Sequence, residues 1–299
     1  MKLLLLGGNG QVGHELRRSL APLGDVVVTT RDGRLGDGKP AEPLDLSDLE
    51  AIPALVQRVR PDAVVNATAY TAVDRAEGER ELAFRINAEA PAVLASSCAE
   101  AGIPLLHYST DYVFDGQGKR PYREDDPTSP LGVYGESKLA GEQAIRGSGA
   151  GYLILRTAWV YALHGHNFLR TMLRLGAERD ELRVVSDQVG SPTPAWLIAD
   201  ATAEILLRGI GTSGILHLTS AGECSWHAFA SEIMRLGVAT GRMAQAPRVT
   251  PIATAEYPTP ARRPAYSVLD TRHLVDRYGV DLPRWEDALA RTLSEDGSD

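Results

Sequence analysis

The 299-residue sequence contains few lysines, few cysteines and no long apolar run. Lysine occurs at only four positions, Lys2, Lys39, Lys119 and Lys138. Two cysteines, Cys98 and Cys224, are too few for a disulfide framework and form no CxxC pattern. No apolar run approaches the ~20 residues that cross a bilayer, and the run Leu3–Leu6 is shorter than the roughly 7–15 residues of a signal-peptide core. We therefore predict a cytoplasmic protein without a membrane partner.

Positive charge is also in deficit, since 31 basic residues face 39 acidic ones and the formal net charge is −8. This balance argues against a non-specific nucleic-acid-binding protein, which is normally basic. It does not exclude an anionic small ligand, because a few local arginines can bind one. The apolar fraction of 43% argues against intrinsic disorder.

Short apolar runs alternate with helical patterns in the first half of the chain, as in βαβ units. The patterns predict strands at Lys2–Leu6, Val26–Thr30, Ala63–Ala67, Leu105–Tyr108, Tyr152–Val160 and Ile215–Leu218, and helices at Gln11–Leu20, Leu49–Arg58, Leu82–Ala101 and Trp226–Leu236. We expect an α/β protein with a Rossmann-like, doubly wound parallel sheet in residues 1–160. Residues 161–299, where the pattern is less regular, are expected to form mainly a smaller substrate-binding lobe.

A glycine-rich turn, Gly7-Gly8-Asn9-Gly10-Gln11-Val12-Gly13, connects the first strand to the first helix. Glycines allow the backbone to turn tightly and to approach a pyrophosphate closely, and the helix N-terminus offers free N–H groups to the phosphates. The alternative is a plain strand-to-helix turn. The position after an apolar strand and before an amphipathic helix favours dinucleotide binding.

The end of the second predicted strand bears on the choice of dinucleotide. An acidic residue there typically holds the ribose 2′-hydroxyl of NAD, whereas an arginine suits the 2′-phosphate of NADP. The sequence reads Thr29-Thr30-Arg31, so we expect NADPH, with Arg31 and also Arg34 as phosphate partners and NADH as the second possibility. The acidic Asp32 beside Arg31 opposes this expectation, and Arg31 as a solvated loop residue is the alternative.

Tyr134 and Lys138 form the only Tyr-x-x-x-Lys pair in the chain. On a helix they lie one turn apart on one face, where an ammonium can stabilise a phenolate and bring its pKa toward neutrality. A hydroxyl cluster, Ser109-Thr110-Asp111-Tyr112, follows another predicted strand, at the edge where open α/β sheets bind ligands. Incidental pairing on an exposed helix and ordinary turn chemistry are the respective alternatives.

These segments resemble the extended short-chain dehydrogenase/reductases and, among them, the dTDP-4-dehydrorhamnose reductase family. The resemblance runs nearly end to end. It rests on GGNGQVGHEL from Gly7, VVNATAYTAVDRAE from Val64, HYSTDYVFDG from His107, SPLGVYGESKLAGE from Ser129, LRTAWVY from Leu155, DQVGSPT from Asp187 and YPTPARRP from Tyr257. It implies reduction of the C4 ketone of dTDP-4-dehydro-6-deoxy-L-mannose to dTDP-L-rhamnose, with hydride from NADPH or NADH, as the last step of dTDP-rhamnose synthesis.

The resemblance also implies roles for individual residues. Tyr134 is the implied general acid, Lys138 lowers its pKa and holds the nicotinamide ribose, and Thr110 hydrogen-bonds the substrate carbonyl. The implied cofactor-binding residues are Gly7, Gly10, Gln11, Val12, Gly13, Arg31, Asp45, Leu46, Ala69, Tyr70, Thr71, Tyr134 and Lys138. The implied substrate-binding residues are Thr110, Asp111 and Trp159, and Arg262 or Arg263 is our candidate for the diphosphate. The alternative for the arginines is a surface basic pair beside prolines.

Three alternatives stay open at this point. His164 and His166 could suggest a metal, but no third ligand is evident, so we predict no catalytic metal and leave a structural or interface cation open. The enzyme could be another nucleotide-deoxysugar 4-ketoreductase or an epimerase. A non-catalytic NADP-binding regulatory subunit, like that of methionine adenosyltransferase, shares the fold. A homodimer is a further expectation, since the family often dimerises.

Overall fold

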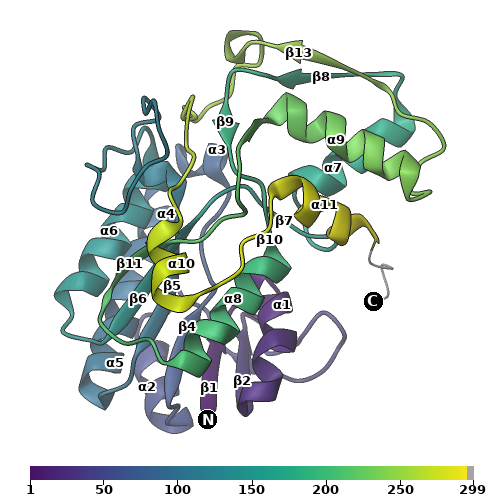
Figure 1. Cartoon of the computed structure of the whole chain (residues 1–299). Helices are drawn as coiled ribbons and strands as arrows, with labels where there is room; N and C mark the ends of the chain where they lie inside the picture. The colour runs from purple at the N-terminus through teal and green to yellow at the C-terminus, as the bar shows by residue number, and fades with distance from the viewer. Residues whose placement is uncertain (295–299) are drawn as a thin grey trace.

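The fold comes from a computed structural model, which describes residues 1–294 (Figure 1). Its centre is a seven-stranded sheet with the order β11-β6-β5-β4-β1-β2-β3, in which all neighbouring strands are parallel. The strands are β1 (Lys2–Leu6), β2 (Asp25–Thr30), β3 (Glu42–Pro43), β4 (Ala63–Asn66), β5 (Leu105–Thr110), β6 (Tyr152–Thr157) and β11 (Gly214–His217). The prediction of a Rossmann-like, doubly wound sheet is confirmed, and the strand order reverses between β1 and β4.

Helices cover both faces of this sheet. One face packs against α1 (Gln11–Leu20), α8 (Ala195–Arg208) and α10 (Arg272–Tyr278), and the other against α2 (Ala51–Val59), α5 (Ala90–Ala101) and α6 (Val133–Gly147). In β1, Leu3 and Leu5 face the first helix layer, whereas Leu4 and Leu6 face the second. Burial on both faces explains why β1 is a continuous apolar run rather than an alternating one.

Two predicted elements differ from the observed ones. The predicted helix 82–101 is divided into α4 (Arg80–Phe84), a π-helical turn η2 (Arg85–Glu89) and α5. The prediction of one strand from Tyr152 to Val160 is wrong beyond Thr157, because Trp159 has a left-handed backbone with φ +47°. After this residue the chain forms β7 (Val160–Tyr161), which leaves the large sheet and pairs with β10 (Thr193–Pro194).

A smaller lobe lies at the end of the sheet opposite the N-terminus (Figure 1). It contains α7 (Phe168–Glu178), β8 (Glu181–Val185), α9 (Trp226–Ala239), β13 (Arg248–Ile252) and α11 (Trp285–Ser294), which share one hydrophobic core. The predicted helix start at Ser225 is confirmed, because its hydroxyl accepts a hydrogen bond from the Ala228 N–H at 3.1 Å. Strands β8 and β13 pair in parallel and close this lobe.

Residues beyond 160 do not all belong to the smaller lobe. Strand β11 is the last strand of the large sheet, and α8 packs against α1 on its face. The remaining short elements are η1 (Ala21–Leu23), α3 (Val73–Ala76), η3 (Asp111–Val113), β9 (Val189–Gly190), β12 (Cys224–Ser225) and η4 (Thr254–Glu256). Every helix within residues 1–294 is too short or too polar to span a lipid bilayer.

Candidate active site

The glycine turn connects β1 to α1 at the carboxyl edge of the sheet. A Cβ atom at Gly13 would lie 2.0 Å from the Gly7 carbonyl oxygen, so only glycine lets the helix approach the strand this closely. Gly7 has φ +88°, a left-handed conformation that side chains disfavour. Gly10 is the N-cap of α1 and offers no side-chain cap, which leaves N–H groups of the first turn available to an anion.

A loop from the second half of the chain covers this turn. Asn167 donates a hydrogen bond to Gln11 Oε1 at 2.8 Å, and His164 Nε2 lies 2.9 Å from Glu15 Oε1. The His14 ring packs against the His164 ring, with ring centroids 4.1 Å apart and planes tilted by 38°. No third metal ligand beside His164 was evident from the sequence, but α1 brings Glu15 and His14 to it, with possible ligand atoms within 4.8 Å of one another.

The end of β2 presents arginines beside the turn. Hydrogen bonds from Ser47 lower the pKa of Asp45, and the charge of the exposed Arg31 adds a smaller lowering. The Asn9 side chain bonds the Arg34 carbonyl at 2.8 Å and the Gly36 N–H at 3.0 Å, and so holds this loop against the glycine turn. Leu46 is buried in the sheet core, so only its backbone can face a cofactor.

The segment Ala69-Tyr70-Thr71 follows β4, the neighbour of β1. Asn87, from the π-helical turn, accepts a hydrogen bond from the Tyr70 N–H at 2.8 Å and donates one to the Tyr70 carbonyl at 3.0 Å. The same amide donates to Ser137 Oγ on α6 at 3.0 Å. Asn87 therefore fixes the backbone under the expected dinucleotide. This role was not predicted, because no local sequence pattern pairs residues 70, 87 and 137.

Helix α6 carries both Tyr134 and Lys138, and its first turn is held by a residue distant in sequence. Its N-cap, Gly132, has no capping side chain, and Glu77 instead accepts a hydrogen bond from the Val133 N–H at 2.9 Å. A Cβ at Gly132 would lie 2.5 Å from the Glu77 carboxylate, so a side chain there would displace this carboxylate. Glu77 was not singled out from the sequence, although it lies in the VDRAE segment.

Tyr134 and Thr110 come together as expected. Burial raises the pKa of Tyr134 to about 12, a hydrogen bond with Thr110 acts in the opposite direction, and Asp111 raises it further. The expected lowering of this pKa by Lys138 is not seen, and burial outweighs the effect of the hydrogen bond with Thr110. At neutral pH the phenol is protonated and able to donate.

Lys138 is buried, and its ammonium group is directed to strand β5. Its Nζ donates to the Tyr108 carbonyl at 2.6 Å and lies 3.3 Å from His107 Nε2. Burial lowers the pKa of Lys138 to about 8, and Glu142 opposes this shift. His107 was not predicted as part of the site.

Asp111 is 2% exposed, and burial raises its pKa to about 6. Hydrogen bonds from Ser267 and Thr110 act in the opposite direction, with the Thr110 hydroxyl 3.0 Å from Oδ1. Within the described part of the chain, Oδ2 has no hydrogen-bond partner. A buried carboxylate oxygen without a partner can accept a hydrogen bond from a ligand hydroxyl.

Trp159 lies at the junction of the two lobes and stacks on Trp226 of α9. The ring centroids are 3.4 Å apart and the planes differ by 5°. A Cβ at Gly190 would lie 2.5 Å from the Trp159 ring, which explains the glycine in DQVGSPT. The left-handed backbone of Trp159 is unusual for a bulky residue and is typical of functional sites.

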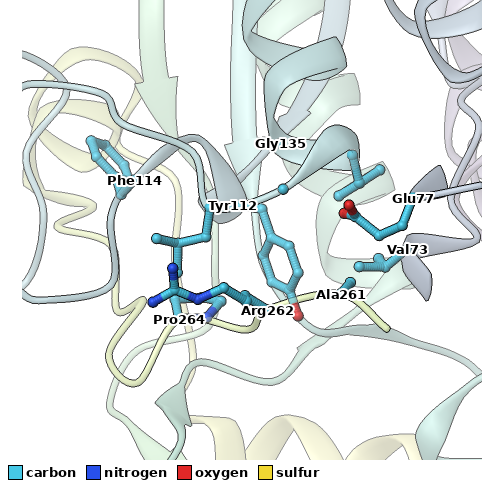
Figure 2. Close-up of a pocket in the computed structure, with 11 residues that line it drawn as sticks. Val73, Glu77, Tyr112, Phe114, Gly135, Ala261, Arg262 and Pro264 are labelled. Atoms are coloured by element: carbon cyan, nitrogen blue, oxygen red, sulfur yellow. The ribbon is translucent and has the colours of Figure 1, made fainter. Parts of the chain in front are cut away.

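The two arginine candidates have different environments. Arg263 forms an ion pair with Asp74 of α3 at 2.8 Å, which holds the C-terminal segment against the first lobe. Arg262 is exposed and lines a small pocket together with Tyr134 and Tyr112. Figure 2 shows Arg262 beside Tyr112 and Pro264. Of the two, Arg262 is therefore the one available to a ligand.

Comparison with known proteins identifies the family. A family model described as RmlD substrate binding domain matches residues 1–297. The chain belongs to this family. A curated relative, the dTDP-4-dehydrorhamnose reductase of Burkholderia thailandensis, is 48% identical over 298 residues, which are 97% of each chain.

Solved structures agree with this family assignment. The dTDP-4-dehydrorhamnose reductase of Clostridium acetobutylicum is 37% identical, covers 98% of both chains and superimposes with a TM-score of 0.89. The corresponding Bacillus anthracis protein, solved in complex with NADP, is 34% identical with a TM-score of 0.87, and the match covers 97% of this chain and 98% of that chain.

Proposed function

We propose that this protein acts as a dTDP-4-dehydrorhamnose reductase, which reduces the C4 ketone of dTDP-4-dehydro-6-deoxy-L-mannose to dTDP-L-rhamnose. The observation that carries the proposal is the meeting of Thr110 and Tyr134 at the carboxyl end of β5, with Lys138 one helical turn farther along. The full-length similarity to reductases with this substrate name supports the choice of sugar.

The residues present suit NADPH as the hydride donor. The glycine turn leaves room for a pyrophosphate where a Cβ would clash, and the exposed Arg31 suits a 2′-phosphate. The NADP complex of the Bacillus anthracis relative supports this preference over NADH. Asp45, Leu46 and the backbone of residues 69–71 are expected to lie along the adenine and ribose.

The proposed chemistry divides hydride and proton delivery between cofactor and protein. NADPH, when bound, supplies the hydride that the C4 carbon of the sugar accepts. Tyr134 donates its proton to the oxygen that becomes an alkoxide, which is a stronger base than a phenolate, so a phenol with a pKa of about 12 can still transfer its proton. Thr110 bonds the Tyr134 hydroxyl and is expected to orient the ketone, and Lys138 is expected to hold the nicotinamide ribose.

Three side chains are proposed to bind the nucleotide sugar. The unpaired Oδ2 of Asp111 accepts a sugar hydroxyl, and the edge of Trp159 contacts the sugar. Arg262 binds the diphosphate, since its guanidinium forms no ion pair or hydrogen bond with the described residues, whereas Arg263 would have to give up Asp74.

The test is consumption of NADPH absorbance on addition of the keto-sugar, with the product identified by NMR. The C4 configuration distinguishes rhamnose from its 4-epimer, so a different deoxysugar or an epimerised substrate would overturn the proposed specificity. Tyr134→Phe should lower kcat by about 10²–10⁴-fold with little change in cofactor Kd. Tyr152→Phe, at the opposite end of the sheet, is the matched control. No turnover together with tight binding of a partner protein would instead favour a regulatory subunit.

The remaining expectations concern the setting of the enzyme. Cys98 and Cys224 are both buried and free, in keeping with the reducing cytoplasm, where disulfides are rare. A homodimer stays a prediction, which the mass in solution tests directly.

A further inference from the structure

A buried polar row runs from β4 through β5 to α6 and joins Lys138 to Asn66 and His107, two residues that the proposed chemistry does not use. Asn66 Nδ2 lies 3.0 Å from His107 Nδ1, and His107 Nε2 lies 3.3 Å from Lys138 Nζ. All three side chains are at most 2% exposed, so water cannot replace these contacts. The position of the proton on the His107 ring therefore decides whether the amine of Lys138 faces an N–H donor or a lone pair.

The orientation of Asn66 is fixed from its other side. Asn66 Oδ1 accepts a hydrogen bond from the backbone N–H of Thr68 at 3.1 Å and another from the Thr68 hydroxyl. A backbone N–H is always a donor, so the carbonyl oxygen must face it and the NH₂ group must face His107. His107 Nδ1 accepts from that NH₂ group and thus carries no proton.

A neutral His107 then carries its proton on Nε2, directed at Lys138. Burial, and secondly the charge of Lys138, hold the pKa of His107 well below its usual value, so the ring is neutral. An ammonium group has no lone pair and cannot accept the Nε2–H bond, whereas a neutral amine can. The imidazole therefore opposes the charged form of Lys138.

The other groups around the Lys138 amine do not cancel the effect of His107, which disfavours the charged ammonium. The Tyr108 carbonyl accepts a hydrogen from either form at 2.6 Å. Glu142, on the next turn of α6, favours the charged form, but both of its oxygens are bonded to the buried Arg156, at 2.9 and 2.7 Å. Tyr134, on the preceding turn, is protonated and uncharged.

We propose that Asn66 and His107 are positioning residues that hold Lys138 on β5 with an N–H group facing its amine, and that Lys138 takes up a proton from solvent when the ribose hydroxyls of the cofactor replace His107 as its partner. The inference rests on the proposed role of Lys138 in holding the ribose. It goes further by coupling cofactor binding to one protonation.

The first test is calorimetric titration of the intact protein with NADP⁺ in two buffers of different ionisation enthalpy, which gives the protons taken up. Lys138 has a pKa of about 8, so about 90% of it is neutral at pH 9. If cofactor binding restores its usual pKa, the complex takes up about 0.9 proton per protein at this pH. At pH 7 the same group is already about 90% protonated, and its uptake falls to about 0.1. Uptake below 0.2 at pH 9 would overturn the proposal.

The second test reads the tautomer directly by ¹⁵N NMR of histidine-labelled protein, with His107→Gln to assign the resonances. The wild type should show a protonated Nε2 and an unprotonated Nδ1, and the opposite tautomer would refute the argument without any variant. In Asn66→Asp the new carboxylate can only accept a hydrogen bond, so the proton of His107 moves to Nδ1. The lone pair on His107 Nε2 then faces the ammonium of Lys138 and stabilises it. This variant should show the reversed tautomer and lose at least two-thirds of the proton uptake at pH 9. Unchanged uptake in a variant with the reversed tautomer would also refute the proposal.

These outcomes separate the inference from the proposed function, since neither test contains a sugar. Proton uptake without sugar reduction would overturn the proposed function and leave the inference standing. A chain that does not bind NADP⁺ would overturn both.

Discussion

Replacing Asp111 with asparagine should make the stability of the protein less dependent on pH. The side chain is buried, and its pKa rises from an ordinary value of 3.8 to about 6 on folding. The folded state therefore binds this proton more tightly than the unfolded chain does. Its contribution to stability is present below pH 3.8 and is lost as the pH rises through about 6.

The shift of about 2 pKa units corresponds to a loss of about 3 kcal/mol at pH 8 relative to low pH. At pH 5 about half of this loss has already occurred, so about 1.4 kcal/mol remains between pH 5 and pH 8. In Asp111→Asn the hydrogen bond from Thr110 to Oδ1 is retained, but no ionisation occurs. The new NH₂ group, at the position of the unpaired Oδ2, costs about 1–3 kcal/mol at every pH.

The measurement is the free energy of unfolding in urea at pH 5 and pH 8. From pH 5 to pH 8 the free energy of unfolding of wild type should fall by about 1.4 kcal/mol more than that of Asp111→Asn. Asp126→Asn is the control, because the pKa of Asp126 is lowered to about 2 and its contribution is constant above pH 5. Parallel pH profiles for Asp111→Asn and wild type, within about 0.5 kcal/mol, would refute the reasoning.

The same variant should raise the KM for the sugar about 10-fold, through loss of one charged hydrogen bond.

Three further predictions concern charged groups. Arg31→Ala should lower kcat/KM for NADPH by about 10–100-fold through loss of a charged hydrogen bond and leave the value for NADH unchanged; equal losses with both cofactors would exclude a phosphate contact. Asp74→Asn should raise the KM for the sugar by freeing the segment that Arg263 holds, with cofactor Kd unchanged as the internal control, and an unaltered KM would show that this ion pair does not shape the sugar site. Glu142→Gln should lower the free energy of unfolding by about 3–5 kcal/mol because it leaves the buried Arg156 charge uncompensated; a loss below about 1 kcal/mol by urea denaturation would contradict this.

Six of the seven strands of the large sheet were predicted, because their burial leaves apolar runs in the sequence. Strand β3 was not predicted, since Glu42 and Pro43 form no apolar run. Strand β1 and helix α1 agree with prediction to the residue, since the glycine turn marks the end of one and the start of the other. The break after Thr157 was not predictable. The left-handed Trp159 is stabilised by its stack on Trp226 and by Gly190, which are distant in sequence.

The residues of the candidate site likewise fall into those that the sequence predicted and those that it did not. Tyr134, Lys138 and Thr110 were found because their chemistry depends on spacing within one helix or on the end of one strand. Glu77 and Asn87 were missed, because each acts by bonding the backbone of another element.

The sequence by itself determined the class of sheet, the glycine turn and the residues that can supply a proton, because these features depend on local spacing. Only the tertiary structure decided which charges are available. It paired Arg263 with Asp74 and left Arg262 exposed, and it buried Lys138 against His107 rather than in water. Burial and partner identity set the charge state of an ionisable group, and both depend on segments that meet only in the folded chain.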